Sequence, residues 1–240
     1  GRKAKIKHEG SELKKADADH TLLALDGLRY RWRGDGTELD IVANMGNIYL
    51  SQGRYRDALT VLKVGGQPFL NTPQAAQIQA AQNQAFRNLF LGGMADGLQP
   101  VEALGLFYDF RDLTPLGADG DEMVRRIVRR LVDVDLFDQA ADLLEHQVNE
   151  RLDGVAKSSV AADLAAIYLM DRNPQKALQT LWNTRTTLVP KSVMAERRIL
   201  EARALNELNE PEKALDVLGN DSSPDGDDVR ADIYWRQNYW

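Results

Sequence analysis

A small residue that recurs at a fixed interval constrains this chain more than any other feature. Ala103, Ala140, Ala177 and Ala214 lie 37 residues apart, and Ala58 precedes the first of them by 45 residues. Four residues beyond each Ala stands a large apolar residue: Leu62, Phe107, Leu144, Leu181 and Leu218. Self-similarity at such a period indicates a repeat protein, in which each unit buries its apolar face only against its neighbours.

Two copies carry a longer motif. Gly46 and Tyr49 precede Ala58, and Ala165 and Tyr168 precede Ala177 in the same way. In both copies the Tyr stands nine residues before the Ala. Small residues at these positions predict paired helices in close contact, because a larger side chain would overpack the interface.

The motif resembles the tetratricopeptide repeat family, whose unit is a helix-turn-helix of about 34 residues. Gly46, Tyr49, Gly53 and Tyr55 match the family pattern, whereas Leu131 and Leu205 replace the Tyr in later copies. The resemblance covers about Asp35 to the C-terminus. It implies an all-α fold: a right-handed α-solenoid of stacked antiparallel helix pairs, with a concave groove lined by the first helix of each pair.

Apolar periodicity and helix-end residues predict twelve helices and no strands. We expect them near residues 20–32, 37–52, 54–64, 74–96, 99–111, 119–133, 136–151, 155–171, 174–187, 191–208, 211–218 and 227–238. Pro100, Pro174 and Pro211 are expected at first helical positions, where a missing N–H has no consequence. Asn173 is expected to cap a helix, and residues 220–228 are expected to form an acidic loop.

Two regions are expected from this reading. Residues 1–19 form a polar N-terminal arm, and residues 20–240 form a repeat array of about five to six helix pairs, truncated at the C-terminus. Tyr239 and Trp240 end the chain on two aromatics, as a severed repeat would, and such an end offers a surface for self-association. We therefore expect a fragment of a larger bacterial protein, similar to the repeat arrays of large exported bacterial proteins.

Composition narrows the functional classes. The chain contains no Cys, so disulfides and thiolate chemistry are excluded, while the bacterial periplasm, cell envelope and cytoplasm all stay open. A net charge of −6 argues against a nucleic-acid partner. No apolar run reaches the roughly 18 residues of a membrane span.

The sequence contains no motif that is typical of a catalytic or metal site. The three histidines, His8, His20 and His146, form no metal-type pair and no nucleophile–base set. The acidic stretches at 119–122 and 225–228 lack the spacing of a calcium loop. Gly92-Gly93 is interpreted as a close helix contact, and the four tryptophans (Trp32, Trp182, Trp235 and Trp240) as packing between repeats. The sequence thus predicts no catalytic, cofactor or metal site.

Five polar residues fall at the groove positions that the resemblance implies: Asn44, Asn47, Arg125, Arg129 and Arg203. Arg125 and Arg129 are four residues apart, so they share a helix face and could hold an acidic ligand. The alternative is a solvated face in which they pair with Asp133, Asp135 or Glu122. Ala43 stands where chaperone-binding members of the family need a Lys, which argues against that partner.

These observations favour a non-catalytic scaffold that binds a peptide or partner protein, with an acidic partner suggested by the arginines. Two alternatives stay open. The array could be an intramolecular assembly scaffold of a longer bacterial envelope protein, or the helical regulatory arm of an enzyme whose catalytic domain lies outside this sequence.

Overall fold

The chain is all-α. The computed structural model describes residues 2–31, 36–69 and 71–237, and within these ranges it contains twelve α-helices and no β-strand. None of the described helices combines the length and apolar character that a membrane-spanning helix requires. The chain divides into two compact units, residues 1–123 and 124–240.

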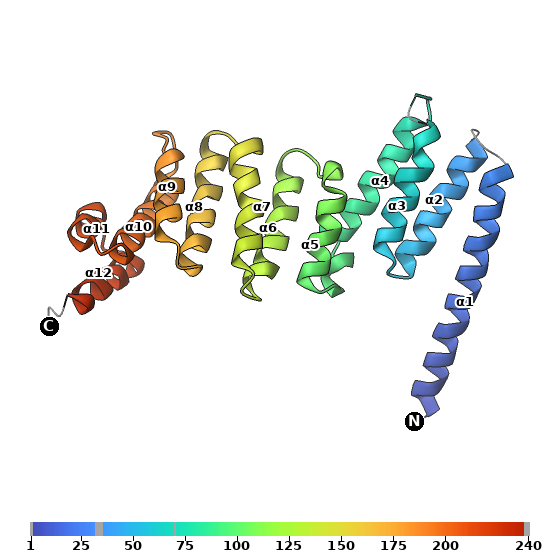
Figure 1. Cartoon of the computed structure of the whole chain (residues 1–240), viewed down its shortest axis with the longest axis horizontal. Coiled ribbons are helices and arrows are strands. Elements are labelled where there is room, and N and C mark those ends of the chain that lie inside the picture. Colours follow the sequence, from blue (N-terminus) through green and yellow to red (C-terminus); the bar gives the residue numbers. More distant parts are fainter. Residues whose placement is uncertain (1, 32–35, 70, 238–240) are drawn as a thin grey trace. The chain divides into compact units, whose positions relative to one another are not determined.

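The first unit contains five complete helices and three short 3₁₀ turns. The helices are α1 (Arg2–Arg31), α2 (Gly36–Ser51), α3 (Tyr55–Gly66), α4 (Ala75–Phe90) and α5 (Pro100–Asp109). The 3₁₀ turns are Gln67–Phe69, Met94–Gly97 and Arg111–Leu113. Helix α2 packs against α1 and α3, and α3 packs against α4 (Figure 1). Phe86 and Phe90 of α4 meet Phe107 of α5 in an aromatic cluster with ring centroids 4.7–5.6 Å apart.

The unit boundary falls within α6 (Ala118–Val132), and the second unit continues through six further helices. These are α7 (Phe137–His146), α8 (Gly154–Met170), α9 (Pro174–Asn183), α10 (Lys191–Glu207), α11 (Pro211–Leu218) and α12 (Pro224–Arg236). A π-helical turn, Gln147–Arg151, extends α7. From α7 to α12 each helix packs against the next along the chain, and α10 also packs against α8 and α12 (Figure 1). The second unit is therefore built from sequential helix pairs.

The recurring alanines are completely buried. Ala58, Ala140, Ala177 and Ala214 expose 0% of their surface, and Ala103 exposes 1%. Each is the fourth residue of its helix, and its backbone N–H donates to the carbonyl of the residue just before that helix, at 3.0–3.2 Å. The predicted burial at matching places is confirmed, with the added detail that each Ala makes the first hydrogen bond of its helix.

The same turn precedes four of these helices. Gly53, Asp135, Arg172 and Asn209 each lie five residues before the buried Ala, and each has a φ between 56° and 73°. The N–H of the following residue then bonds to the carbonyl five positions earlier, at 2.7–2.9 Å, as in a Schellman motif. Three of these left-handed residues are not Gly. Asp135 and Asn209 are types that adopt this conformation more readily than others, whereas for Arg172 it costs about 1–2 kcal/mol.

Ala103 lies after a different connection. The sequence predicts one helix over 74–96, but α4 ends at Phe90 and Gly93 adopts a φ of 83°. The interpretation of Gly92-Gly93 as a helix contact is therefore wrong, because Gly93 supplies the positive φ of a turn. Tyr55 secures this region by donating its hydroxyl hydrogen to the carbonyl of Met94 at 2.7 Å.

Two further regions differ from expectation. Residues 2–19 belong to the same helix as residues 20–31, so no break separates an arm from the first helix. The expected acidic loop at 220–228 instead contains the start of α12 at Pro224, capped by Ser223, whose Oγ accepts from the Gly226 N–H at 3.1 Å. Hydrogen bonds from Ser223 to Asp221 lower the pKa of the Asp221 carboxyl. Trp32, Tyr239 and Trp240 lie outside the described residues.

Close approach of helices explains the small residues. A Cβ added to Gly46 would lie 3.1–3.3 Å from the Leu62 side chain, and one added to Gly65 would lie 2.6 Å from Val42. At Gly65 a side chain would force α2 and α3 apart or Val42 to move, whereas at Gly46 a small displacement of Leu62 would suffice. Ala165 fills the position equivalent to Gly46 and is fully buried.

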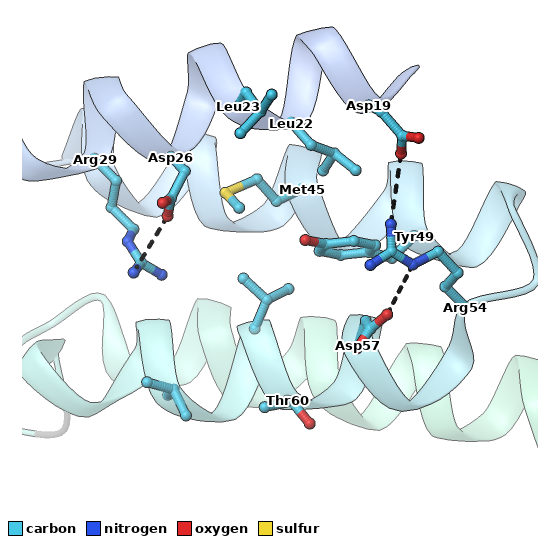
Figure 2. Close-up of a pocket in the computed structure, with 12 residues that line it drawn as sticks. Asp19, Leu22, Leu23, Asp26, Arg29, Met45, Tyr49, Arg54, Asp57 and Thr60 are labelled. Carbon is cyan, nitrogen blue, oxygen red and sulfur yellow. Dashed lines mark hydrogen bonds and ion pairs between the residues drawn. The ribbon is translucent and has the colours of Figure 1, made fainter. Parts of the chain in front are cut away.

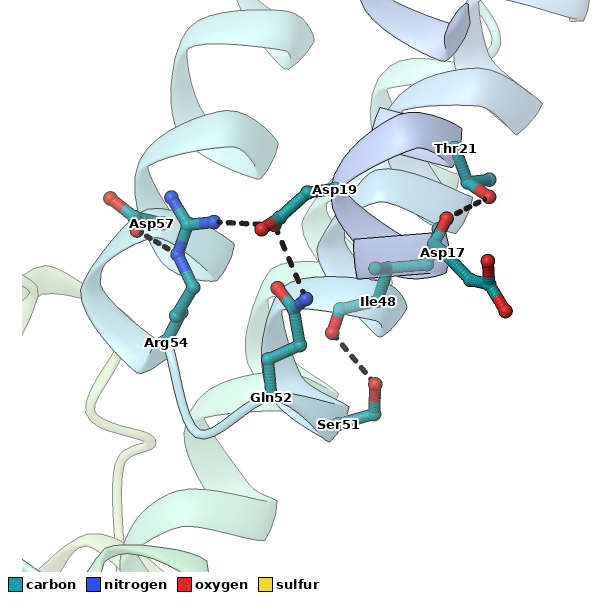
Figure 3. A network of polar contacts seen from close by, with 8 residues as sticks. All are labelled: Asp17, Asp19, Thr21, Ile48, Ser51, Gln52, Arg54 and Asp57. Atoms are coloured by element: carbon teal, nitrogen blue, oxygen red, sulfur yellow. Dashed lines mark hydrogen bonds and ion pairs between the residues drawn. The ribbon is translucent and has the colours of Figure 1, made fainter. Parts of the chain in front are cut away.

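A polar network fastens α1 to the turn between α2 and α3 (Figure 3). The Asp19 carboxylate lies 3.5 Å from Arg54 Nη1 and accepts from Gln52 Nε2 at 3.4 Å. Arg54 also donates its Nε–H to Asp57 at 2.7 Å, and this hydrogen bond raises the pKa of the guanidinium. The Tyr49 ring lies under Arg54, 4.5 Å from the guanidinium carbon.

A buried arginine joins three helices of the second unit. Arg197 of α10 donates from Nη1 to the Ser158 carbonyl of α8 at 2.6 Å. Its Nη2 donates to the Leu181 carbonyl and to Thr184 Oγ1, at the end of α9. Burial lowers the pKa of Arg197, and the Glu201 carboxylate opposes that shift. The carbonyl end of α9 favours a cation, so Arg197 acts as a C-terminal cap from another helix.

Replacing Ala177 by Leu should lower the free energy of unfolding by about 1–3 kcal/mol, because the fully buried site has no room for the larger side chain. Ala156→Leu, at an exposed position of α8, is the matched control and should change stability little. Chemical denaturation followed by circular dichroism measures both. Equal stability of Ala177→Leu and the native chain would contradict the packing described.

Gly53→Ala should destabilise the chain by about 1 kcal/mol, because it forces a Cβ into the left-handed region. Gly105→Ala is the opposite case. Gly105 lies inside α5, and the nearest atom to an added Cβ is 3.8 Å away. This variant should gain up to about 1 kcal/mol from helix propensity. Thermal unfolding of the two variants should therefore shift in opposite directions, and shifts of the same sign would contradict the turn geometry.

Candidate functional site

A pocket of about 320 Å³ lies in the second unit, between α6 and α8. Its lining residues are Arg125, Val128, Arg129, Val132, Asp133, Leu144, Asp163, Ala166, Ile167 and Met170. Val128, Leu144 and Ile167 are buried and form an apolar floor, whereas the charged residues are exposed. An apolar pocket with a few charged groups at its edge is typical of a binding site for part of a larger ligand.

Two arginines form one side of this pocket. Arg125 and Arg129 are one helical turn apart on α6, and Val128 and Val132 lie beside them on the same helix. The fork geometry of a guanidinium suits a carboxylate or phosphate group. The predicted shared face of Arg125 and Arg129 is confirmed, since both line one pocket.

Asp163 of α8 lies across the pocket from the arginines. The Asp163 side chain still reaches solvent, but the surrounding pocket wall removes enough water to raise the pKa of its carboxyl. The Glu196 carboxylate of α10 raises it further, and the Arg125 guanidinium opposes both effects. Two cations of α6 and two anions, Asp163 of α8 and Asp133 just beyond the end of α6, therefore line the pocket.

The other three predicted groove residues lie elsewhere. Arg203 is exposed on α10 and does not line the pocket. Asn44 and Asn47 are exposed on α2, in the first unit. The structure thus brings together two of the five residues, and the groove role of all five stays a prediction.

Sequence reasoning missed Asp163 and Met170. A signal for Asp163 was present, because Asp163 precedes Ala177 by 14 residues, as Asn44 precedes Ala58. Applying the groove register to every repeat would have found it. Met170, which is 55% exposed, carries no such signal, because an exposed Met at a helix end is ordinary in a sequence.

The remaining candidates do not form a site in the part of the chain that the structure describes. No group of three or more His, Asp or Glu side chains is arranged there to hold a metal ion. Trp182 and Trp235 are 49% and 64% exposed, so neither belongs to the core. Trp182 instead donates its Nε1–H to Glu201 at 2.7 Å. The pocket offers charge and apolar surface, which suits binding.

Comparisons with known proteins add little. No protein-family model and no curated protein matches the chain. Among solved structures, the chain is similar to the crystal structure of BtubC (BKLC) from P. vanneervenii, with 13% sequence identity and a TM-score of 0.37. The alignment covers 95% of this chain and 92% of that chain. A likeness at this TM-score carries no argument about function.

Asp163→Asn should stabilise the chain at pH 7. A raised pKa in the folded state means that ionised Asp163 opposes folding. Below the unfolded-state pKa of about 3.9, Asp163 is protonated and contributes its full share to the free energy of unfolding. This contribution is lost as the pH rises through the pKa of Asp163 in the folded state. The gain should stay below about 1 kcal/mol, since Asp163 is exposed, and should vanish near pH 3.5. Asp142→Asn, on exposed α7 surface, is the control. A gain that does not depend on pH would contradict the assignment.

Proposed function

We propose that the chain is a non-catalytic protein-binding scaffold that takes a peptide or a partner helix in the pocket between α6 and α8. The observation that carries the proposal is the combination of an apolar floor with Arg125 and Arg129 on one face. An apolar side chain of the partner would fill the pocket, and a carboxylate beside it would reach the arginines. This arrangement matches the anchor-and-rim character of peptide-binding surfaces.

The helix pairs support a scaffold of the tetratricopeptide type. The 37-residue intervals, the buried alanines and the four left-handed turns repeat as identical structural units would. A stacked solenoid of such pairs offers an extended surface made from first helices. Under this proposal α6, α8 and α10 are first helices, and the pocket lies on the surface that they share.

Electrostatics would decide which acidic partners bind. Arg125 and Arg129 attract a carboxylate, whereas Asp163 and Glu196 repel one from the α8 side. The acidic group of the ligand would therefore lie over α6, with its apolar anchor toward Ile167 and Met170. Wrong orientations would bring like charges together, which is a common source of specificity.

A photo-crosslinking amino acid placed at Met170 in the full chain tests this proposal. Met170 and Val155 are both exposed apolar residues of α8, at 55% and 43%, but only Met170 lines the pocket. We expect a discrete crosslinked partner from position 170 and much less from position 155. Reversing the pocket charge with Arg125→Glu and Arg129→Glu should reduce the yield at 170 while circular dichroism stays unchanged.

Two outcomes would overturn the proposal. Equal crosslinking from positions 170 and 155 would show that the pocket has no selectivity. An unchanged crosslinking yield at position 170 after Arg125→Glu and Arg129→Glu would show that the two arginines do not contribute to binding. Arg203→Glu, an exposed α10 arginine outside the pocket, is the control for a change of net charge alone.

A further inference from the structure

A second and larger hollow lies in the first unit, between α1 and α3, with α2 behind it. We call it the α1–α3 crevice, and its volume is about 610 Å³. Its lining residues are Asp19, Leu22, Leu23, Asp26, Arg29, Met45, Tyr49, Arg54, Asp57, Thr60, Val61 and Val64. Figure 2 shows Leu22 and Leu23 of α1 on one side, Met45 and Tyr49 of α2 behind, and Thr60 of α3 on the other side.

The walls of the crevice are apolar and partly uncovered. Leu22, Met45 and Val61 are buried at 5%, 4% and 9% exposure, and they form the floor. Leu23 on α1 and Val64 on α3 are 73% and 57% exposed, although both line the crevice. Two large apolar side chains left in water beside an apolar floor suit an apolar ligand that would cover both.

The charged rim favours a cationic ligand. Three carboxylates and two guanidiniums surround the opening. Both guanidiniums are engaged by the rim itself: Arg29 lies 3.4 Å from Asp26, and Arg54 bridges Asp57 and Asp19. The side chains of Asp19, Asp26 and Asp57 are still about half exposed, at 48%, 47% and 50%. A carboxylate accepts several hydrogen bonds at once, so the rim can still bind donors, and one negative charge is in excess.

The length of the crevice suits a short helix. The α1 wall runs from Asp19 to Arg29, ten steps along the helix that rise about 15 Å. A partner helix of about three turns has the same length and could lie along α1 and α3. Helix-in-groove recognition typically places apolar residues at i, i+3, i+4 and i+7 against such walls.

We propose that the α1–α3 crevice is a second docking surface, which takes an amphipathic helix of a partner protein with leucine-like residues on one face and Lys or Arg at its edges. The apolar face of that helix covers Leu23 and Val64. Its cations bind the carboxylates of Asp19, Asp26 and Asp57. This surface is separate from the pocket proposed above, and it prefers the opposite charge in its ligand.

Two peptides of equal length and equal apolar pattern test this inference on the full chain. Each has 14 residues with Leu at i, i+3, i+4, i+7 and i+11, and the remaining positions are Ala with four Lys in one peptide and four Glu in the other. Fluorescence anisotropy of the labelled peptides gives the affinities. We expect the Lys peptide to bind about tenfold or more tightly than the Glu peptide, and to weaken as salt screens the exposed charges.

The double variant Leu23→Ser and Val64→Ser should weaken the Lys peptide by about tenfold, since both side chains are exposed and their loss leaves the fold intact. Leu116→Ser is the matched control, because Leu116 is a 90% exposed Leu outside the crevice. It should leave the affinity unchanged. Arg125→Glu with Arg129→Glu should also leave it unchanged, which separates this surface from the proposed function.

Three results would overturn the inference. The first is tighter binding of the Glu peptide than of the Lys peptide, and the second is an equal loss of affinity in Leu116→Ser and in the double variant. The third is a dimer of the native chain that dissociates when Leu23 and Val64 are both replaced by Ser. The last result, measured by sedimentation velocity, would show that a second copy of this chain covers the crevice. Failure of the crosslinking experiment at Met170 would leave this inference unaffected, because no residue is shared between the two surfaces.

Discussion

The buried alanine at the fourth position of each second helix is the contact on which the repeat depends. At this position the helix has just formed its first hydrogen bond, so the Ala side chain and the preceding turn are fixed together. A larger residue would overpack this completely buried position. Because the chain reaches the site through the same left-handed turn in four copies, both the separation and the register of the pair are specified locally. The register of each pair in turn decides which side chains of its first helix face outward.

Much of this fold can be predicted from the sequence. The 37-residue interval located the buried alanines, and Pro100, Pro174 and Pro211 begin their helices as expected. Asn173 caps α9 by accepting from the Lys176 N–H, at 3.4 Å. These features are local, because a cap or a first-turn Pro acts within four residues. Local rules are the ones that a single sequence can reveal.

Other features of the fold and of the pocket depend on tertiary contacts, which a short sequence pattern does not contain. Arg172 occupies a left-handed turn although its side chain disfavours that conformation, so tertiary pairing overrides propensity there, whereas Asp135 and Asn209 are residue types that adopt it more readily. Gly93 looked like a helix contact because its neighbours continue the apolar period. For the site, the i, i+4 spacing of Arg125 and Arg129 was enough to predict a common face. Leu144 of α7 lines the same pocket, and Glu196 of α10 acts on Asp163, and only the packing of the helices brings these residues near each other.

The α1–α3 crevice and the pocket between α6 and α8 differ in the carboxylates that surround their arginines. In the α1–α3 crevice Arg54 pairs with Asp19 of α1 and with Asp57 of α3. In the pocket between α6 and α8 the arginines face an aspartate whose ionisation is disfavoured by its surroundings. An aspartate that opposes folding at neutral pH is a local conflict, since Asn or Ala there would relieve it. Such conflicts concentrate where a surface serves binding rather than stability. Asp163 is therefore a residue that the stability of the fold does not account for, which agrees with the binding role proposed for this pocket.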